Sequence, residues 1–477
     1  MPWINVLASY SESFPYVILE GARMKKATVS SKVGGLEDLF VQNENGFLYT
    51  PGDSDALAEH LETLLDDPEK RLSMGEKLYL TAKEHFSLET MCNTQLGIYN
   101  SIQYKEKQNE KDDKLYDITI LGYYGYDNSG DDAILKSFID HVQKYHKDLS
   151  VVVLSNNPSQ TRKLYRVQSV YRFHPLKLPT ILSKTRLFIT GGGTLVQDGT
   201  SSRSLWYYLS MIKLALKKGA HAVLFANGLG PLTRKKNRKA ASEILDRMEV
   251  ITLRDANAYE QLKSLGVKKP LTKVAVDPVL ALSPADLSIG YNILKNEGVP
   301  LDGNIVAFCI RKWKKVKRAE EILAALADKI SLELHAIPLF VPMQLPNDLR
   351  FSKKIVRCMK EKGYVLHGRY SVDESMSILG NTNLIIGMRL HSLIYAANMG
   401  LPMVGLAYEP KVDYFMQSIS QPYVSWDDSF SMPELMEKIN EVWQNSSSIK
   451  DTLKEMKPHL ELKGKEAIEL TLSPLKQ

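Results

Sequence analysis

The sequence predicts an α/β protein built mainly from two doubly wound lobes with a cleft between them. Short apolar runs typical of buried parallel strands alternate with helical spacings through residues 117–277, and again after Pro300. Many of these runs end in glycine-rich or charged turns, such as TGGGT at 190–194 and GMRLH at 387–391. Consecutive β–turn–α units build one parallel sheet, so two such series indicate two lobes with ligands at the strand carboxyl ends.

The composition sets the outer limits of this prediction. A chain of 477 residues exceeds one ordinary core, and 44% hydrophobic with 24% charged residues is typical of a soluble globular protein. No apolar run approaches the ~20 residues of a membrane span, and MPWIN at the start is no secretory signal, so we expect a cytoplasmic protein. The three cysteines are too dispersed for a disulfide framework or a zinc site, so no metal is expected.

The sequence of residues 1–103 predicts a smaller, partial Rossmann-like α/β domain. A strand is expected at 4–8, one helix is expected to start at Tyr16, and two more are expected at 53–65 and 68–86. ESFPYVILE places Glu12 and Glu20 eight residues apart, and it resembles the Glu-x7-Glu motif of retaining GT-B glycosyltransferases of the family 4 type. SSKVGGLEDLF and NGFLYTPGD resemble the segments that follow in that family. The resemblance implies that Glu20 contacts the nucleotide-sugar ribose and that Glu12 lies near the donor sugar.

The same comparison predicts that this region does not transfer sugar alone. Only 11 residues precede Glu12, whereas such enzymes carry an acceptor-binding domain and a diphosphate-binding Arg and Lys upstream. Residues 1–103 are therefore expected to be a truncated C-terminal piece of a glycosyltransferase. The charged run KEKQNEKDDK predicts a linker at 104–115, followed by lobes at 116–300 and 301–477.

The first lobe begins with the strand DITIL at 117–121, which runs into GYYGYDNSGDD. This glycine spacing fits neither the dinucleotide fingerprint nor a P-loop. Later strands end at a triple glycine, at a basic segment and at Arg254-Asp255, and a strand expected at 274–276 ends at an Asp-Pro pair. The groups expected at the cleft are Asn128, Gly191, Gly192, Gly193, Asp198, Arg234, Arg238 and Asp277.

The second lobe carries the stretch on which the functional prediction depends, residues 387–411. Its strands are expected at 305–310, 332–339, 364–366, 384–386 and 403–406. After the fourth, Gly387 makes a tight turn, and Arg389 and His391 fall in the first helical turn, where backbone N–H groups favour an anion. Lys411 follows the next strand, and Arg311 follows the first. Together these groups suit a small, highly charged anion.

A set of motifs gives a second resemblance. GYYGYDNSGDDAIL, TGGGTLVQDGTSSRS, ANGLGPL, TLRD, VDPVLAL, IRKW, GMRLHSLIYAANMGLP and AYEPKV resemble the polysaccharide pyruvyl transferase family over roughly residues 116–430. The likeness is to the bacterial CsaB type, which modifies the secondary cell-wall polymer used in S-layer anchoring. It implies a GT-B-like fold and phosphoenolpyruvate as co-substrate, with no other cofactor. The product it implies is a 4,6-pyruvyl ketal on a terminal N-acetylmannosamine of a lipid-linked oligosaccharide.

The residues are assigned to that chemistry as follows. Arg389 and Lys411 are expected to bind the phosphate and carboxylate, with Arg234 or Arg238 as a third cation. His391 is the candidate general acid and base, because the unperturbed pKa of a histidine side chain lies near working pH. The remaining catalytic candidates, Asp198 and Asp277, are expected to bind or deprotonate the sugar hydroxyls, and Gly191–Gly193, Asn128 and Arg311 to contact substrate.

Three alternatives remain open at this level. The whole chain could be one glycosyltransferase that uses a nucleotide-sugar, or it could be a non-catalytic remnant of a fused enzyme. The basic runs at 234–239 and 311–318 could contact nucleic acid, but nothing else resembles a nucleic-acid module, so no such partner is expected. These runs instead predict peripheral contact with anionic lipids at the inner face of the plasma membrane.

Overall fold

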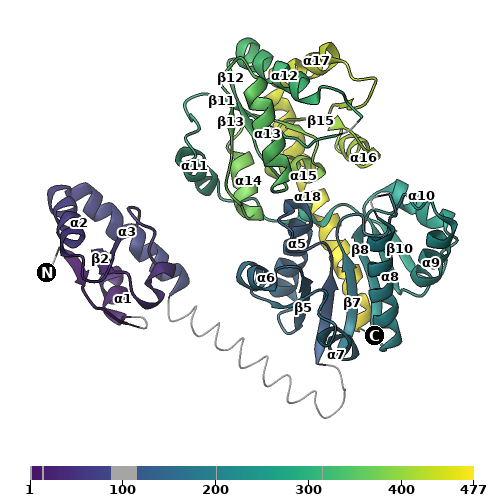
Figure 1. The fold of residues 1–477 in the computed structure, drawn as a ribbon, viewed down its shortest axis with the longest axis horizontal. Coiled ribbons are helices and arrows are strands. Elements are labelled where there is room, and N and C mark those ends of the chain that lie inside the picture. Colours follow the sequence, from purple (N-terminus) through teal and green to yellow (C-terminus); the bar gives the residue numbers. More distant parts are fainter. Residues whose placement is uncertain (1–2, 13–14, 87–114, 200, 314, 477) are drawn as a thin grey trace. The chain divides into compact units, whose positions relative to one another are not determined.

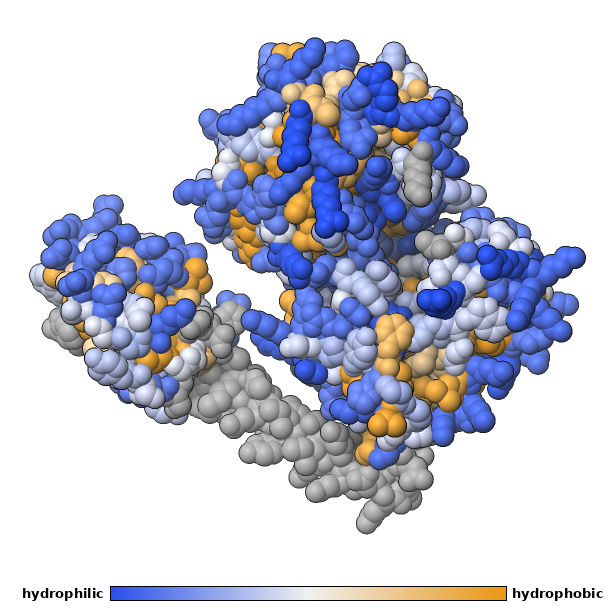
Figure 2. Space-filling view, in the orientation of Figure 1, coloured by the Kyte–Doolittle hydropathy of each residue, from blue (hydrophilic) through white to orange (hydrophobic). Residues whose placement is uncertain are grey.

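The computed structural model describes residues 3–12, 15–86, 115–199, 201–313 and 315–476, and contacts divide the chain into two compact units, 1–110 and 111–477 (Figure 1). The sheets of both units are parallel, and helices alternate with their strands, which confirms the α/β class. Within the described residues, no helix is long and apolar enough to cross a bilayer. The face drawn in Figure 2 is largely hydrophilic, with scattered apolar side chains, as is usual for a folded surface.

Unit 1 contains a three-stranded parallel sheet in the order β1-β2-β3. Its strands are β1 (Ile4–Leu7), β2 (Ala27–Ser31) and β3 (Phe47–Tyr49), and its helices are α1 (Tyr16–Arg23), α2 (Ser54–Asp66) and α3 (Pro68–His85), with a 3-10 turn η1 (Gly34–Asp38). Asp53 and Asp67 accept N-cap hydrogen bonds at α2 and α3, which fixes where these helices begin. The expected elements of this unit are therefore present.

The first lobe of unit 2, here called lobe one, is a seven-stranded parallel sheet in the order β10-β9-β8-β7-β4-β5-β6. Its strands are β4 (Tyr116–Leu121), β5 (Val151–Ser155), β6 (Gln168–Tyr171), β7 (Thr185–Gly191), β8 (His221–Asn227), β9 (Val250–Leu253) and β10 (Leu271–Val274). Its helices are α5 (Ser129–Tyr145), α6 (Pro158–Tyr165), α7 (Lys177–Ser183), α8 (Ser202–Lys217), α9 (Lys235–Leu245) and α10 (Ala256–Ser264). Strand order reverses between β4 and β7, so the two glycine-rich turns that follow these strands lie side by side.

Lobe two is a six-stranded parallel sheet in the order β13-β12-β11-β14-β15-β16. Its strands are β11 (Asn304–Cys309), β12 (Ala336–Phe340), β13 (Tyr364–Val365), β14 (Leu384–Gly387), β15 (Met403–Ala407) and β16 (Tyr423–Ser425). Its helices are α12 (Ala319–Leu334), α13 (Asn347–Cys358), α14 (Val372–Gly380), α15 (Leu390–Met399), α16 (Pro410–Ser418) and α17 (Met432–Gln444). The order reverses between β11 and β14, which brings the turns carrying Arg311 and Arg389 together.

Two expected strands begin elsewhere in the structure. The expected strand at 332–339 overlaps the end of α12, because the helix continues to Leu334 and ends at left-handed His335, whose φ is 48°. The expected strand at 274–276 lies mostly beyond β10, and the following residues leave the sheet to reach Asp277.

Helices also cross the expected boundary at residue 300. Helix α11 (Leu287–Asn296) packs against α14 of lobe two. Helix α18 (Ser446–Leu472), followed by the 3-10 turn η3 (Ser473–Lys476), runs back from lobe two to contact β8, β9 and α5 of lobe one (Figure 1). Each lobe is thus completed by a helix from the other half of the sequence.

The lobes meet at the first turn of α5. The Ser129 N–H donates to the Met343 carbonyl at 3.2 Å, and its hydroxyl lies 2.8 Å from the hydroxyl of buried Tyr395 on α15. Asn128 and Gln344 form an isolated antiparallel bridge beside this contact. These bonds fix the glycine-rich turn of lobe one against the catalytic candidates of lobe two.

Candidate functional site

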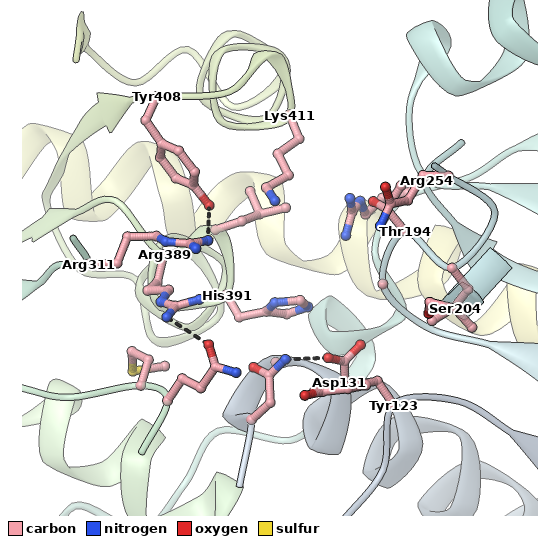
Figure 3. A pocket seen from close by; sticks show the side chains of 18 of the residues that line it. Tyr123, Asp131, Thr194, Ser204, Arg254, Arg311, Arg389, His391, Tyr408 and Lys411 are labelled. Atoms are coloured by element: carbon pink, nitrogen blue, oxygen red, sulfur yellow. Dashed lines mark hydrogen bonds between the residues drawn. The ribbon is translucent and has the colours of Figure 1, made fainter. Parts of the chain in front are cut away.

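A cavity of about 390 Å³, here called the cleft pocket, lies between the two lobes where strands of both sheets end (Figure 3). Lobe one contributes the start of α5, the loop after β7 and the end of β9, and lobe two contributes the turns after β11, β12, β14 and β15. The polar and charged side chains in its wall are Tyr123, Asn128, Asp131, Thr194, Gln197, Ser204, Tyr208, Arg254, Arg311, Gln344, Arg389, His391, Tyr408 and Lys411.

His391 and Asp277 come together in the structure. The Nε2 atom of His391 lies 3.5 Å from Oδ2 of Asp277, and the Asp277 side chain is only 2% exposed. Burial raises the pKa of Asp277, but the neighbouring His391 imidazole and the charge of Arg254 outweigh it and hold the pKa below its usual value. Asp277 therefore stays ionised and holds the imidazole. Asp277 does not line the cleft pocket. The structure places it behind His391, and not in the predicted contact with sugar hydroxyls.

Gly130 makes room for this imidazole. A Cβ atom built at Gly130 would lie 2.1 Å from Nδ1 of His391, closer than any real contact. The first turn of α5 can therefore approach the ring only because residue 130 has no side chain.

The four cations of the cleft pocket differ in how far they are neutralised. Arg389 donates to buried Asp348 at 2.6 and 2.9 Å and to Gln344 at 2.9 Å, so its charge is matched by a carboxylate. Lys411 lies 2.5 Å from Glu409.

Arg311 is held by an aromatic side chain instead. It donates to the Tyr408 hydroxyl at 3.2 Å and stacks on that ring, 5.2 Å from its centroid. Its buried Nε has no hydrogen-bond partner, and within the described part of the chain Arg311 forms no ion pair. Arg311 is therefore the cation with the most unmatched charge.

Arg254, noted in the sequence only as a strand end, supplies the cation expected from Arg234 or Arg238. Its side chain is 7% exposed, and its nearest carboxylate oxygens lie 3.9 Å away on Asp277 and 4.0 Å away on Asp255. Arg234 is exposed at the N-terminus of α9, and Arg238 donates to the Ser264 carbonyl at 2.9 Å; neither lines the cleft pocket.

The path of one loop explains this difference. The loops after β7 and β8 run side by side, since Val196 bridges Leu229 and the Asp198 N–H donates to the Pro231 carbonyl at 2.9 Å. Helix α9 therefore begins only beyond this paired extension, away from the cleft pocket.

Asp198 belongs to the same extension and does not line the cleft pocket. Its carboxylate accepts from the Thr233 N–H and hydroxyl at 2.9 and 3.1 Å, from the Arg234 N–H at 3.1 Å and from Asn237 at 2.9 Å. Burial raises its pKa, but these hydrogen bonds lower it to about 2. The structure thus gives Asp198 the role of fixing a loop, in place of the predicted catalytic one.

Of the three glycines at the end of β7, only Gly193 lines the cleft pocket. The Gly191 carbonyl accepts from the Tyr124 hydroxyl at 2.9 Å, and the Gly192 N–H donates to the Phe225 carbonyl at 3.1 Å. Gly192 and Gly193 have φ values of 85° and 63°, which favour glycine. The triple glycine therefore serves mainly to turn the chain.

Asp131 is a site residue that sequence reasoning missed. It lines the cleft pocket, accepts from Asn128, and is 7% exposed. Burial raises its pKa to about 6, although the charges of His391, Arg254 and Lys411 act in the opposite direction. The turn GYYGYDNSGDD offered three aspartates, and only the packing of α5 selects this one.

One group of described residues has metal-ligand chemistry, and it lies outside the cleft pocket. His141, His146 and Glu469 place their ligand atoms within 4.8 Å of one another. Oε1 of Glu469 lies 2.8 and 2.6 Å from the two Nε2 atoms, an arrangement that ties the end of α18 to α5.

In unit 1, Glu12 and Glu20 are both exposed. Glu12 accepts from the Ser9 hydroxyl at 2.9 Å, and Glu20 lies on α1. The two glutamates therefore face solvent on this unit.

Two Rossmann-like lobes with a charged cavity at facing strand ends define a GT-B-type group-transfer protein. Comparison of the chain with the model of the polysaccharide pyruvyl transferase family matches residues 128–410, and the chain belongs to that family. The amylovoran biosynthesis protein AmsJ of Erwinia amylovora is 20% identical over 70% of this chain and 93% of its own length. The resemblance to the polysaccharide pyruvyl transferase family seen in the sequence is confirmed.

Solved structures share the fold at low identity. Anabaena HepE in complex with UDP-glucose matches with a TM-score of 0.54 and 13% identity, over 75% of this chain and 99% of that one. The S. aureus MnaA–UDP structure matches with a TM-score of 0.52 and 11% identity, over 71% and 91%.

Residues 2–80 match the model of glycosyl transferases group 1, as the Glu-x7-Glu resemblance indicated. N-acetyl-alpha-D-glucosaminyl L-malate synthase of Bacillus anthracis is 28% identical over 112 residues, which is 24% of this chain and 28% of that enzyme. This chain thus spans less than a third of that glycosyltransferase relative.

Proposed function

We propose that unit 2 transfers the pyruvyl group of phosphoenolpyruvate, as a 4,6-ketal, to a terminal N-acetylmannosamine of a lipid-linked cell-wall polysaccharide precursor. The observation that carries this proposal is the convergence of Arg254, Arg311 and Lys411, from separate turns of both lobes, around His391. Phosphoenolpyruvate has a phosphate and a carboxylate, and charge-assisted hydrogen bonds from several cations are the interactions that hold such a molecule.

The chemistry assigns a proton transfer to His391. As an imidazolium held by Asp277, it gives a proton to the methylene carbon of the enol, and the adjacent carbon becomes oxocarbenium-like. Two sugar hydroxyls form bonds to that carbon, and its bond to the phosphate oxygen breaks. One hydroxyl proton returns to the imidazole, and the other leaves with inorganic phosphate.

Asp131 suits the deprotonation of the second sugar hydroxyl, whose proton it then passes to the departing phosphate. It lines the cleft pocket, and its pKa of about 6 makes it a carboxylate at neutral pH that is basic enough to accept a proton. Asp277 acts through His391 as a positioning residue. Arg389, matched by Asp348, orients the amide of Gln344 at the pocket wall.

The proposal extends to the setting of the reaction. The product would serve S-layer anchoring, and exposed basic residues such as Lys235 and Lys236 would hold the protein at anionic lipids on the cytoplasmic face of the membrane. Unit 1 would not transfer sugar by itself.

The test is release of inorganic phosphate from phosphoenolpyruvate by the full chain with a lipid-linked ManNAc–GlcNAc acceptor. His391→Ala should abolish release, and Glu20→Gln on unit 1 should leave it unchanged. Because fold relatives were solved with UDP or UDP-glucose, calorimetric titration with UDP-glucose tests the nucleotide-sugar alternative. Tight UDP-glucose binding without phosphate release would replace pyruvyl transfer by glycosyl transfer.

A further inference from the structure

A second cavity, of about 530 Å³ and here called the apolar pocket, adjoins the cleft pocket. It is bounded by the end of β10, by α15 and α16, and by α18, the helix that runs from lobe two to lobe one (Figure 1). Much of its wall is apolar: Val274, Leu280, Ile394, Phe415, Ile419 and Leu460.

The two cavities share part of their walls. Arg254, Leu390 and Lys411 line both, and Figure 3 shows Arg254 and Lys411 extending toward the cleft from opposite lobes. A ligand that occupies the apolar pocket can therefore continue past these two cations toward His391.

The apolar pocket also carries two lysines of its own. Lys273 pairs with Glu466 at 3.1 Å, but both side chains are about half exposed, and such a pair is worth little in water. Among the described residues, Lys463 forms no ion pair, and it also lines this cavity. An acidic group can bind to these lysines without breaking a buried salt bridge, and the carboxylates of the same wall are those of Asp255, Asp277 and Glu466.

Apolar side chains continue from the cavity to the surface. Val274 and Tyr414 line the apolar pocket and are 42% and 41% exposed. Leu271 on β10 and Leu462 on α18, two of the elements that bound the cavity, are 57% and 56% exposed, although neither lines it. Exposed apolar groups beside cations match a ligand that is itself part aliphatic and part anionic.

We propose that the apolar pocket binds the aliphatic chain of a lipid phosphate, with the acidic group on Lys273 and Lys463, so that an attached sugar reaches the cleft pocket. The inference rests on the proposed function, because it identifies this lipid as the carrier of the acceptor. The apolar wall would contact the aliphatic chain of the lipid, and the lysines would bind its acidic group. Arg254 and Lys411 line both cavities and therefore lie where the ligand would pass toward the reacting groups.

Direct binding tests this proposal without any turnover. The full chain is titrated calorimetrically with hexyl and decyl phosphate below their micelle concentrations, and with inorganic phosphate. Each methylene that leaves water should tighten binding about fourfold until the cavity is full. Equal affinity for inorganic and decyl phosphate would overturn the proposal.

Matched variants locate the binding. Ser418→Trp fills the cavity from an exposed position on α16, and Gln417→Trp adds the same bulk at the adjacent exposed position, which does not line it. Decyl phosphate should bind at least tenfold more weakly to the first variant and normally to the second. Val274→Glu, at the exposed mouth, should weaken binding as well without changing the core. Unchanged decyl phosphate binding to both Ser418→Trp and Val274→Glu would overturn the assignment to this cavity.

Phosphate release separates failure of this inference from failure of the proposed function. Ser418→Trp should raise the KM for the lipid-linked acceptor and leave the KM for the same disaccharide without its lipid unchanged. An equal effect on both acceptors would overturn the lipid assignment. Absence of release with either acceptor would remove the proposed function, and with it the acceptor role of the lipid, while the alkyl phosphate titration still reports on the pocket.

Discussion

Replacing Asp277 by Asn should lower the catalytic activity of the cleft pocket without changing its shape. The carboxylate lies 3.5 Å from Nε2 of His391 and 3.9 Å from Nη1 of Arg254, and its side chain is 2% exposed. A unit charge at this separation contributes about 4 kcal/mol at an effective dielectric constant near 20. The amide keeps the shape but not the charge, so the imidazolium would face Arg254 without compensation.

That loss sets the size of the expected effect. If most of the ~4 kcal/mol is needed to keep His391 charged and oriented, kcat should fall by about 10²–10³-fold. The KM for phosphoenolpyruvate should change much less, because Asp277 does not line the cleft pocket. Initial rates of phosphate release, measured at saturating acceptor, give both constants.

Asp198→Asn is the matched control, since both aspartates are buried and both were catalytic candidates in the sequence. Loss of its hydrogen bonds should lower Tm, because a buried hydrogen bond to a charged group contributes about 1.5–3 kcal/mol. At 25 °C, kcat should stay within about twofold of the wild-type value. The reasoning is refuted if Asp277→Asn keeps more than a third of the activity, or if the folded Asp198→Asn protein loses as much as Asp277→Asn.

Three further predictions follow from the same geometry. Arg311→Lys removes the planar group that stacks on Tyr408, so calorimetry should show phosphoenolpyruvate binding at least tenfold more weakly, and unchanged affinity would exclude Arg311 from the anion site. Gly130→Ala should cut kcat at least a hundredfold with little change in Tm, because the new Cβ displaces the His391 ring; normal kcat would show that the ring adapts. Burial, followed by the charge of Asp131 and other acids, raises the pKa of Asp132 to about 8, so the folded state binds a proton that the unfolded state has lost above about pH 4. Asp132→Asn should therefore raise Tm at pH 7–8 and have almost no effect on Tm at pH 4, and a Tm gain that did not grow with pH would contradict this linkage.

Local sequence signals were sufficient for the element on which the functional prediction depended. The strand expected at 384–386, the tight turn at Gly387 and the helix expected to start beside Arg389 are found as β14 and the start of α15. Each feature depends on residues within a few positions of one another, so it can be seen without knowledge of the fold. For the same reason Arg389, His391 and Lys411 were correctly placed at strand ends.

Local signals failed where a helix and a strand compete for the same apolar residues. Leu332 and Leu334 fit either element, and only the left-handed conformation of His335 decides that α12 ends there and that β12 starts at Ala336. Boundaries of this kind depend on which residues pack into the core.

By itself, therefore, the sequence determined the α/β class, the family, and the turn that presents His391. The tertiary structure decided which charges surround that histidine. Arg254 and Asp131 enter the cleft pocket, and Arg234 and Asp198 do not, because strand order and the paired loops after β7 and β8 set where each turn ends. All four residues lie in turns or near the start of a helix, so no local pattern separates them; only the strand order and the loop paths of the folded lobe do.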